Sequence, residues 1–234
     1  MMKNFAVAGF LPLIFAFVHP PVFVTGQWID QTKKAKTLYV KQETTLIDPA
    51  LPGGSTAVEE EIWIRKPTFF RKTAKFPKGI IHWVLTPSRA VRISGGKIEN
   101  ILPLDVYGAV GLFFLPDGTR RFSHMLSQAG VAADSTHWAM KDRRVLYQMG
   151  APEGDKLFFA KDDWVPAGYQ TKTKDYRLSV LLPSRFPVPF PDMSEVTVDG
   201  KIVETTRVKS VKENLSLSDA VFDINALKNA QAQK

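Results

Sequence analysis

The alternation of side-chain character over residues 56–65 constrains the fold of this chain more than any other feature. The two parities of the stretch differ: Val58, Ile62 and Ile64 share one, whereas Glu59, Glu61 and Trp63 share the other. A period of two is typical of a strand in a sheet with one buried face, because successive side chains point to opposite faces. Glu60 breaks the apolar set. The stretch therefore predicts a half-buried β-strand.

Similar strand signals recur along the chain and are separated by turn residues. Asp199-Gly200 is a two-residue hairpin signal between the last two stretches. The proline-rich segment 182–191 belongs to an edge or a loop, because proline donates no hydrogen bond to a sheet. A meander of sequential strands is the simplest arrangement. The expected strands cover residues 37–47, 56–65, 68–74, 80–85, 90–93, 145–149, 156–161, 176–182, 195–198 and 202–211.

The middle of the chain differs in kind from the rest. Residues 101–115 are almost wholly apolar and contain Gly108 and Gly111, and residues 119–130 have the pattern of a helix. We expect the helices here, so the predicted class is mainly β with a few helices (α+β). No internal repeat divides the chain, and its length suits one domain of the β-sandwich or barrel type.

The first 26 residues have the layout of a cleavable signal peptide. Lys3 gives a positive start, and residues 5–18 are apolar without a charge. This run of roughly 14 residues is shorter than the ~20 that a membrane-spanning helix needs. We expect a cut after Gly26, which leaves residues 27–234 as the mature domain. The alternative is an uncleaved amino-terminal anchor.

Composition excludes several classes of site. The chain has no cysteine, so disulfides, thiolate metal sites and lipid attachment to cysteine are impossible, and stability must come from apolar burial. The four histidines have no metal-ligand spacing, and Gly95-Gly96-Lys97 lacks the pattern of a phosphate loop. No serine lies in a nucleophile elbow. We therefore predict no metal, no cofactor, no catalytic residue and no enzymatic activity.

Four segments of the chain together form a recognisable pattern. The main match is residues 60–71 (EEIWIRKPTFFR), an aromatic strand followed by a basic pair, a proline and an aromatic residue that leads the next strand. Weaker matches are residues 92–98 (RISGGKI), residues 157–162 (LFFAKD) followed by Pro166, and residues 218–224 (SDAVFDI). In this order they span most of the mature chain, and together they resemble the LolA and LolB type of periplasmic lipoprotein-sorting protein.

The resemblance implies a strongly curved antiparallel sheet, an incomplete barrel, with helices covering a concave apolar face that receives acyl chains. This sequence departs from the pattern in two places. Residues 28–36 offer only about two turns for the amino-terminal helix, and the apolar block 101–115 is unusual. We interpret that block as part of a lid.

Aromatic residues on the expected strands and the apolar block are the candidates for lining such a cavity. The alternative for each is an ordinary core position. The basic residues Arg65, Lys66 and Arg71 are candidates for contact with anionic head groups at a membrane surface, and a solvated strand face is the alternative. The cavity candidates are Trp63, Phe69, Phe70, Trp83, Phe113, Phe114 and Phe158.

The function predicted from these observations is an exported, periplasmic carrier that holds acyl chains, a lipid or a lipoprotein and makes transient membrane contact. The alternative is a cell-envelope sensor or protein-interaction module on the same fold that transports no lipid. Nucleic acid binding would also use the basic charge, but export removes the protein from most nucleic acid. A hydrolase is the third hypothesis, since a single sequence does not reveal every active site.

Overall fold

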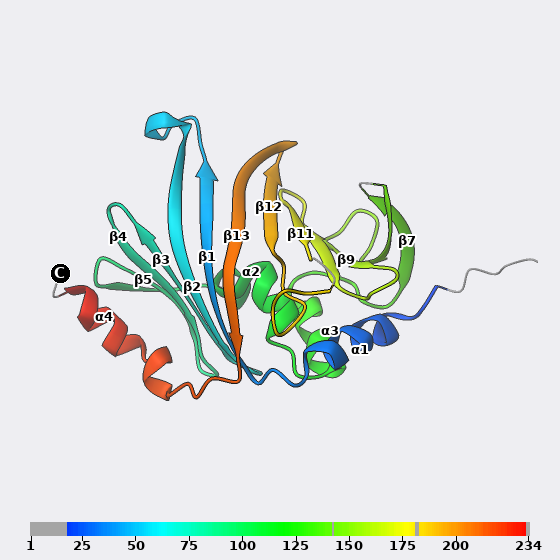
Figure 1. Cartoon of the computed structure of the whole chain (residues 1–234), viewed down its shortest axis with the longest axis horizontal. Helices are drawn as coiled ribbons and strands as arrows, with labels where there is room; N and C mark the ends of the chain where they lie inside the picture. The colour runs from blue at the N-terminus through cyan, green and yellow to red at the C-terminus, as the bar shows by residue number, and fades with distance from the viewer. Residues whose placement is uncertain (1–17, 142, 181–182, 233–234) are drawn as a thin grey trace, which may run out of the picture.

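The molecule is built on one open, curved sheet. The structure is a computed structural model that describes residues 18–141, 143–180 and 183–232. Its 13 strands follow the order β6-β5-β4-β3-β2-β1-β13-β12-β11-β10-β9-β8-β7 (Figure 1). Neighbouring strands are antiparallel throughout. Because β6 and β7 are the two edges and do not pair, the sheet is an incomplete barrel.

The strand bounds show two meanders that meet at the first and last strands. Strands β1 to β6 run outward from one side of the β1–β13 pair, and β12 back to β7 run outward from the other. The strands are β1 Thr37–Ile47, β2 Ser55–Arg65, β3 Phe69–Phe76, β4 Gly79–Leu85, β5 Ala90–Ser94, β6 Lys97–Asn100, β7 Thr136–Lys141, β8 Arg144–Met149, β9 Lys156–Ala160, β10 Pro166–Gln170, β11 Asp175–Ser179, β12 Met193–Val198 and β13 Lys201–Glu213.

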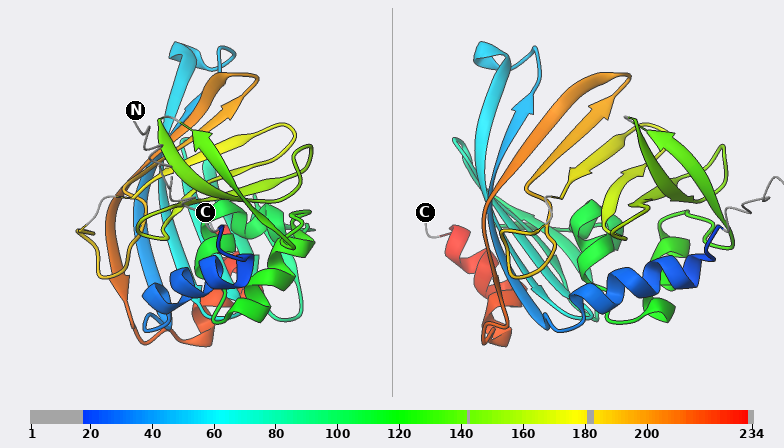
Figure 2. Two further views of the ribbon diagram at one scale, coloured as in Figure 1. Left: turned by 90° about the vertical axis from the view of Figure 1, so that its right-hand side faces the viewer. Right: turned by 45° about the vertical axis from the view of Figure 1, so that its right-hand side comes forward.

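Helices lie on both sides of the sheet. On the concave side are α1 (Pro21–Thr32), α2 (Pro103–Phe114) and α3 (Thr119–Gln128), and on the convex side are the 3-10 turn η2 (Asp219–Phe222) and α4 (Ile224–Ala232) (Figures 1 and 2). The hairpin tips at η1 (Pro52–Gly54) and at the β12–β13 turn project beyond the concave-side helices (Figure 2). These helices therefore cover only part of the concave face.

The cover on the concave side is held together by Trp28. Its side chain is fully buried, its indole nitrogen donates a hydrogen bond of 2.9 Å to the carbonyl of Phe113, and its ring meets Phe114 edge-on at 5.3 Å. Gly108 interrupts α2 with φ 52° and ψ −154°, a conformation that other residues rarely adopt. Thus α2 consists of two short segments, and the second of them is fixed to α1.

The predicted fold class is confirmed, and most of the expected strands are present. The Asp199-Gly200 turn is also confirmed, with φ of 49° and 74° at its two residues, and residues 183–191 form no strand. Residues 181–182 lie outside the described part of the chain. The strands β6, β7 and β10 were not predicted. β10 begins with Pro166 and contains Gly168, two residue types that weaken a strand signal.

The amino-terminal segment enters the core earlier than the predicted boundary at residue 26. The helix α1 begins at Pro21, Val24 is fully buried, and Phe23 contacts the Trp164 ring edge-on at 5.4 Å. A cut after Gly26 would therefore divide α1. Residues 1–17 lie outside the described part of the chain, and within that part no helix is long and apolar enough to span a membrane.

A shortened chain tests whether residues 18–26 belong to the folded domain. A chain that begins at Gln27 should lose about 3 kcal/mol of unfolding free energy relative to one that begins at Val18, because burial of a side chain such as Val24 contributes about 1.5–3 kcal/mol and the Phe23 contact adds to it. Urea unfolding measures the difference. Equal stability of the two chains would show that the cut after Gly26 leaves the domain intact.

Candidate functional site

A cavity of about 400 Å³ lies between the concave face of the sheet and α2. Its floor combines strands from both meanders, and its roof is the interrupted first part of α2. The volume falls within the range of small-ligand pockets, about 300–1,000 Å³. The residues that line it include Gln42, Glu60, Ile62, Phe70, Lys72, Asp105, Tyr169, Lys174, Tyr176, Leu178, Ser194, Val196, Glu204 and Thr206.

Strand register explains which side chains reach the cavity. Ile62, Glu60 and Val58 have one parity on β2 and are all buried. Their register partners on β1 are Val40, Gln42 and Thr44 respectively, and residues paired across adjacent strands share a face. The Glu60 carboxylate, which interrupts the apolar parity of β2, therefore lies on the concave face, in the middle of the sheet.

The Glu60 carboxylate is the centre of a buried polar network. It accepts hydrogen bonds from Gln42 Nε2 at 2.6 Å and Thr44 Oγ1 at 2.7 Å, and it forms an ion pair of 3.2 Å with Lys72. Thr44 also shares a hydrogen bond of 2.9 Å with Thr206 on β13. With 7% of its surface exposed, Glu60 is stable as an anion only because these partners replace its hydration.

The partners determine the ionisation of Glu60. Burial alone would raise its pKa, but the Lys72 ammonium and the hydrogen bonds from Gln42 and Thr44 outweigh burial and hold the pKa below its usual value. The same ammonium lies 4.6 Å from the centre of the Trp83 ring, a cation–π contact. Lys72 is thus engaged by a carboxylate and by an aromatic ring.

Glu204 provides a second carboxylate in the cavity and has the opposite shift. Burial raises the pKa of Glu204; Lys72 opposes the shift and Glu60 adds to it. Glu204 is the register partner of Val196, and Val196 is the partner of Tyr176. These three side chains therefore form one row across β13, β12 and β11 on the face that lines the cavity.

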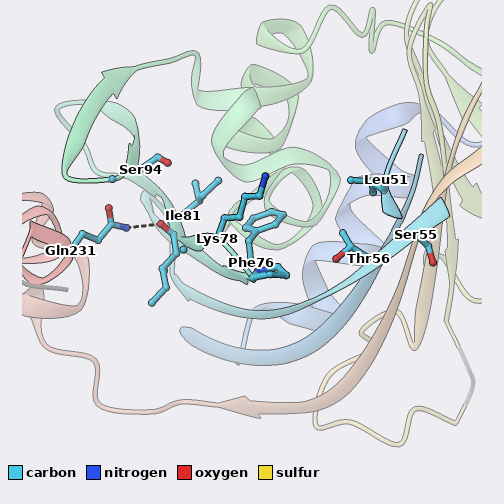
Figure 3. Close-up of a pocket in the computed structure, with 12 residues that line it drawn as sticks. Leu51, Ser55, Thr56, Phe76, Lys78, Ile81, Ser94 and Gln231 are labelled. Carbon is cyan, nitrogen blue, oxygen red and sulfur yellow. Dashed lines mark hydrogen bonds between the residues drawn. The ribbon is translucent and has the colours of Figure 1, made fainter. Parts of the chain in front are cut away.

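A second hollow of about 870 Å³ lies between the start of β2 and the β3–β4 turn, and Gln231 of α4 borders it. In Figure 3, Phe76 and Lys78 of the β3–β4 turn lie between Leu51 on one side and Ser94 on the other. At its edge, Gln231 of α4 donates a hydrogen bond of 2.8 Å to the carbonyl of Ile80. The hollow is open and mainly apolar.

The structure does not bring the predicted cavity aromatics together. Phe70 lines the cavity, and Trp83 lies next to it through its contact with Lys72. Trp63 and Phe69 instead lie on the convex face, where they pack with the cluster that contains Phe222. Their strand parity places them there, because Trp63 follows the concave Ile62, and Phe69 precedes the concave Phe70.

The remaining predicted aromatics are core residues. Phe113 and Phe114 are fully buried in the second half of α2. Phe113 packs edge-on against Phe159 at 5.7 Å, and Phe114 lies 4.5 Å from Phe190. Phe158 is buried on β9 with the Lys141 ammonium 4.7 Å from its ring centre. Of the seven candidates, only Phe70 is part of the cavity wall.

The predicted basic residues contact other parts of the chain. Arg65 forms an ion pair of 2.7 Å with Asp219, and Arg71 Nη1 donates a hydrogen bond of 3.0 Å to the carbonyl of Val221. Lys66 Nζ donates to the carbonyl of Thr32 at 2.9 Å. Burial, aided by nearby Lys36, lowers the pKa of Lys66 to about 8. These groups hold the carboxy-terminal segment and α1 against the sheet.

Several cavity residues were not predicted from the sequence. Tyr169, Tyr176 and Glu204 come from the second meander, which lies far from β2 in sequence. Glu204 carried a weaker signal than Glu60, since its strand parity combines Ile202 and Val208 with polar residues. Among the described residues, no group of three histidine or acidic side chains is placed to hold a metal ion.

Replacing Glu60 tests the buried network. At pH 7, Glu60→Gln should lower the unfolding free energy by about 1–3 kcal/mol, because Lys72 loses its buried partner. Since the folded state lowers the pKa of Glu60, this stabilisation is present above the usual value of 4.5 and disappears as pH falls through the lower folded-state value. Urea unfolding between pH 7 and pH 3 should show the two proteins converging.

The control is Glu59→Gln on the opposite face of β2. Glu59 is exposed and its ion pair with Lys75 is 3.9 Å long, so its loss should change stability by less than about 0.5 kcal/mol. Equal effects of the two substitutions at pH 7 would contradict the role assigned to Glu60.

No family model and no curated protein sequence matches this chain. Solved structures do. A DUF1329 family protein from Desulfovibrio piger matches with a TM-score of 0.51 at 11% identity, over 89% of this chain and 100% of the other. A LolA superfamily protein from Nitrosomonas europaea matches with a TM-score of 0.49 at 12% identity, over 88% and 98%.

At this identity the likeness concerns the fold alone. The match to the Desulfovibrio protein extends over the whole of that chain and 89% of this one, so it concerns the fold as a whole. The chain therefore shares its overall fold with this protein, and the open, curved antiparallel sheet is the architecture that the sequence resemblance implied.

Proposed function

We propose that this protein is an exported, periplasmic binding protein or carrier that holds an acyl chain of a lipid or lipoprotein beneath α2. The observation that carries the proposal is the cavity of about 400 Å³ between the concave face and α2. Its apolar wall includes Ile62, Phe70 and Leu178, so an alkyl chain would replace water there. Each methylene that leaves water contributes about 0.8 kcal/mol.

The hollow near the hairpin tips extends the space for a ligand. Both hollows lie along the same β2 and β3 strands: Phe70 and Lys72 line the first, and Phe76 lines the second. These β3 residues share one parity and hence one face. A chain longer than the first cavity can hold continues along this face toward the open end of the sheet.

The roof of the cavity is the element that admits the ligand. Gly108 divides α2, and the segment after it is fixed through Phe113 to Trp28. The segment before it follows the exposed residue Leu102 and covers the cavity with the buried residues Val106 and Tyr107. This first segment moves about the Gly108 joint and acts as the lid.

A second candidate function is a protein-interaction module of the cell envelope that transports no lipid. The open apolar hollow beside Leu51 and Phe76 favours it (Figure 3), because apolar patches that no element covers often mark binding surfaces. Capture of envelope proteins by a chain with an intact hollow, but with no bound lipid, supports this second function.

Filling the cavity tests the carrier function. Ser194→Trp places a large side chain into the cavity from β12 and should weaken the binding of a fluorescent hexadecyl probe with an uncharged head about tenfold or more. The indole displaces about two methylenes of the probe from the cavity, and each contributes about 0.8 kcal/mol to binding. Fluorescence titration measures the affinity, and mass spectrometry of the purified protein detects lipid that co-purifies.

The matched control is Glu195→Trp, one residue further along β12. Successive strand residues point to opposite faces, so this indole lies on the convex side and should leave probe affinity unchanged. The absence of probe binding and of co-purifying lipid in the unmodified protein would refute the carrier function.

A further inference from the structure

The cavity beneath α2 has the opposite electrostatic character to the chain as a whole. The chain carries a formal net charge of +8. The ionisable residues at the cavity include three acids, Glu60, Asp105 and Glu204, but only two bases, Lys72 and Lys174. A cavity for alkyl chains alone needs no charge, and buried charges cost free energy. Their presence indicates that the ligand has a polar group.

The acidic groups differ in how fully they are neutralised. Glu60 has an ion pair and two hydrogen bonds, so little of its charge is left for a ligand. Among the residues that the structure describes, no lysine or arginine makes an ion pair with Glu204. A hydrogen bond with Thr206 and the ammonium groups of Lys72 and Lys174 stabilise its anion in part. Asp105 also has no ion pair in this part of the chain, but it is exposed on α2, so Glu204 is the acid of the cavity floor whose ion pair a ligand would supply.

Strand register places an aromatic ring opposite Glu204. Tyr176, Val196 and Glu204 form one row, and two strand spacings of ~4.8 Å put the outer residues about 10 Å apart. Val196 between them is short and buried. Tyr169 stacks on Tyr176 at 5.7 Å and extends the aromatic wall. A carboxylate facing aromatic rings is an arrangement that binds ammonium groups.

From this row we infer that, if the protein is a carrier as proposed above, its preferred ligand is an amphiphile with a protonated amine in the head group. The ammonium lies over Val196, where it forms an ion pair with Glu204 and meets the face of the Tyr176 ring. The alkyl chain leads away along Ile62 and Phe70. A head group that is a free carboxylate meets the same Glu204 and is rejected.

Three single-chain probes of equal length separate the contributions of head and tail. Dodecylamine, dodecanol and dodecanoate, each below its micellar concentration, compete with the uncharged fluorescent probe. The amine should bind about tenfold more tightly than the carboxylate. Non-specific attraction to a chain of net charge +8 favours the carboxylate, so surface charge cannot produce the expected order.

Two variants locate the head group. Glu204→Gln should weaken dodecylamine binding about tenfold and leave dodecanol unchanged, and Tyr176→Leu should weaken the amine several-fold through loss of the ring. Glu195→Gln removes an equal charge from the opposite face of β12 and should change none of the three affinities. Thermal unfolding confirms that each variant is folded.

The outcomes separate this inference from the proposed function. If all three probes bind alike and Glu204→Gln changes none of them, the amine preference is wrong and the carrier function stands. If Glu195→Gln acts like Glu204→Gln, overall charge explains the effect and the inference is again wrong. If no probe binds the unmodified protein, the carrier function and the inference both fail.

Discussion

The structure depends on one constraint: a curved sheet that does not close has a concave apolar face that the chain must cover. Three short helices supply the cover, and the hydrogen bond from Trp28 to Phe113 joins the first helix to the second. Because the strands at the hairpin tips extend past these helices, the cover is incomplete. The cavity beneath α2 and the hollow beyond it are direct consequences of this mismatch.

The convex face has a separate cover, which explains the arrangement of the basic residues. The segment from η2 to α4 packs Phe222 and Ile224 against Val84 and Ile93. Arg65 lies 4.0 Å from the ring centre of Phe69 and reaches Asp219, so its aliphatic part and its charge both hold this segment. Arg65, which the sequence suggested for contact with a membrane surface, thus contacts another part of the same chain.

Much of the fold was predictable from the sequence because the first meander follows simple rules. The strand expected at residues 37–47 matches β1, Thr37–Ile47, and the parity of residues 58–64 correctly separated two faces. Parity does not tell which face is concave or what covers it. The segment that packs on Trp63 and Phe69 comes from about 150 residues further along the chain, so those residues were placed in the cavity by their chemistry alone.

The candidate site was less predictable than the fold because it is assembled across both meanders. Glu60 was recognised as an exception within its strand, but its meaning depends on Gln42, Thr44 and Lys72, which meet it only through strand register. The position of Glu204 depends likewise on the pairing of β13 with β12. Sequence periodicity identifies such exceptions one strand at a time, whereas the register of the whole sheet decides which of them meet.

The charged residues Glu60, Lys72 and Glu204 beneath α2 lower the stability of the protein when the cavity is empty. A buried ion pair is often no more stabilising than apolar side chains of the same volume, and Ile or Leu at residues 60, 72 and 204 would fill the space beneath α2. The chain instead retains a neutralised pair, Glu60 with Lys72, next to a carboxylate whose pKa burial has raised. Such polar groups are expected where a ligand completes their interactions. Glu204 has a hydrogen bond with Thr206 but no ion pair among the described residues, so a cation between it and Tyr176 would supply the missing partner.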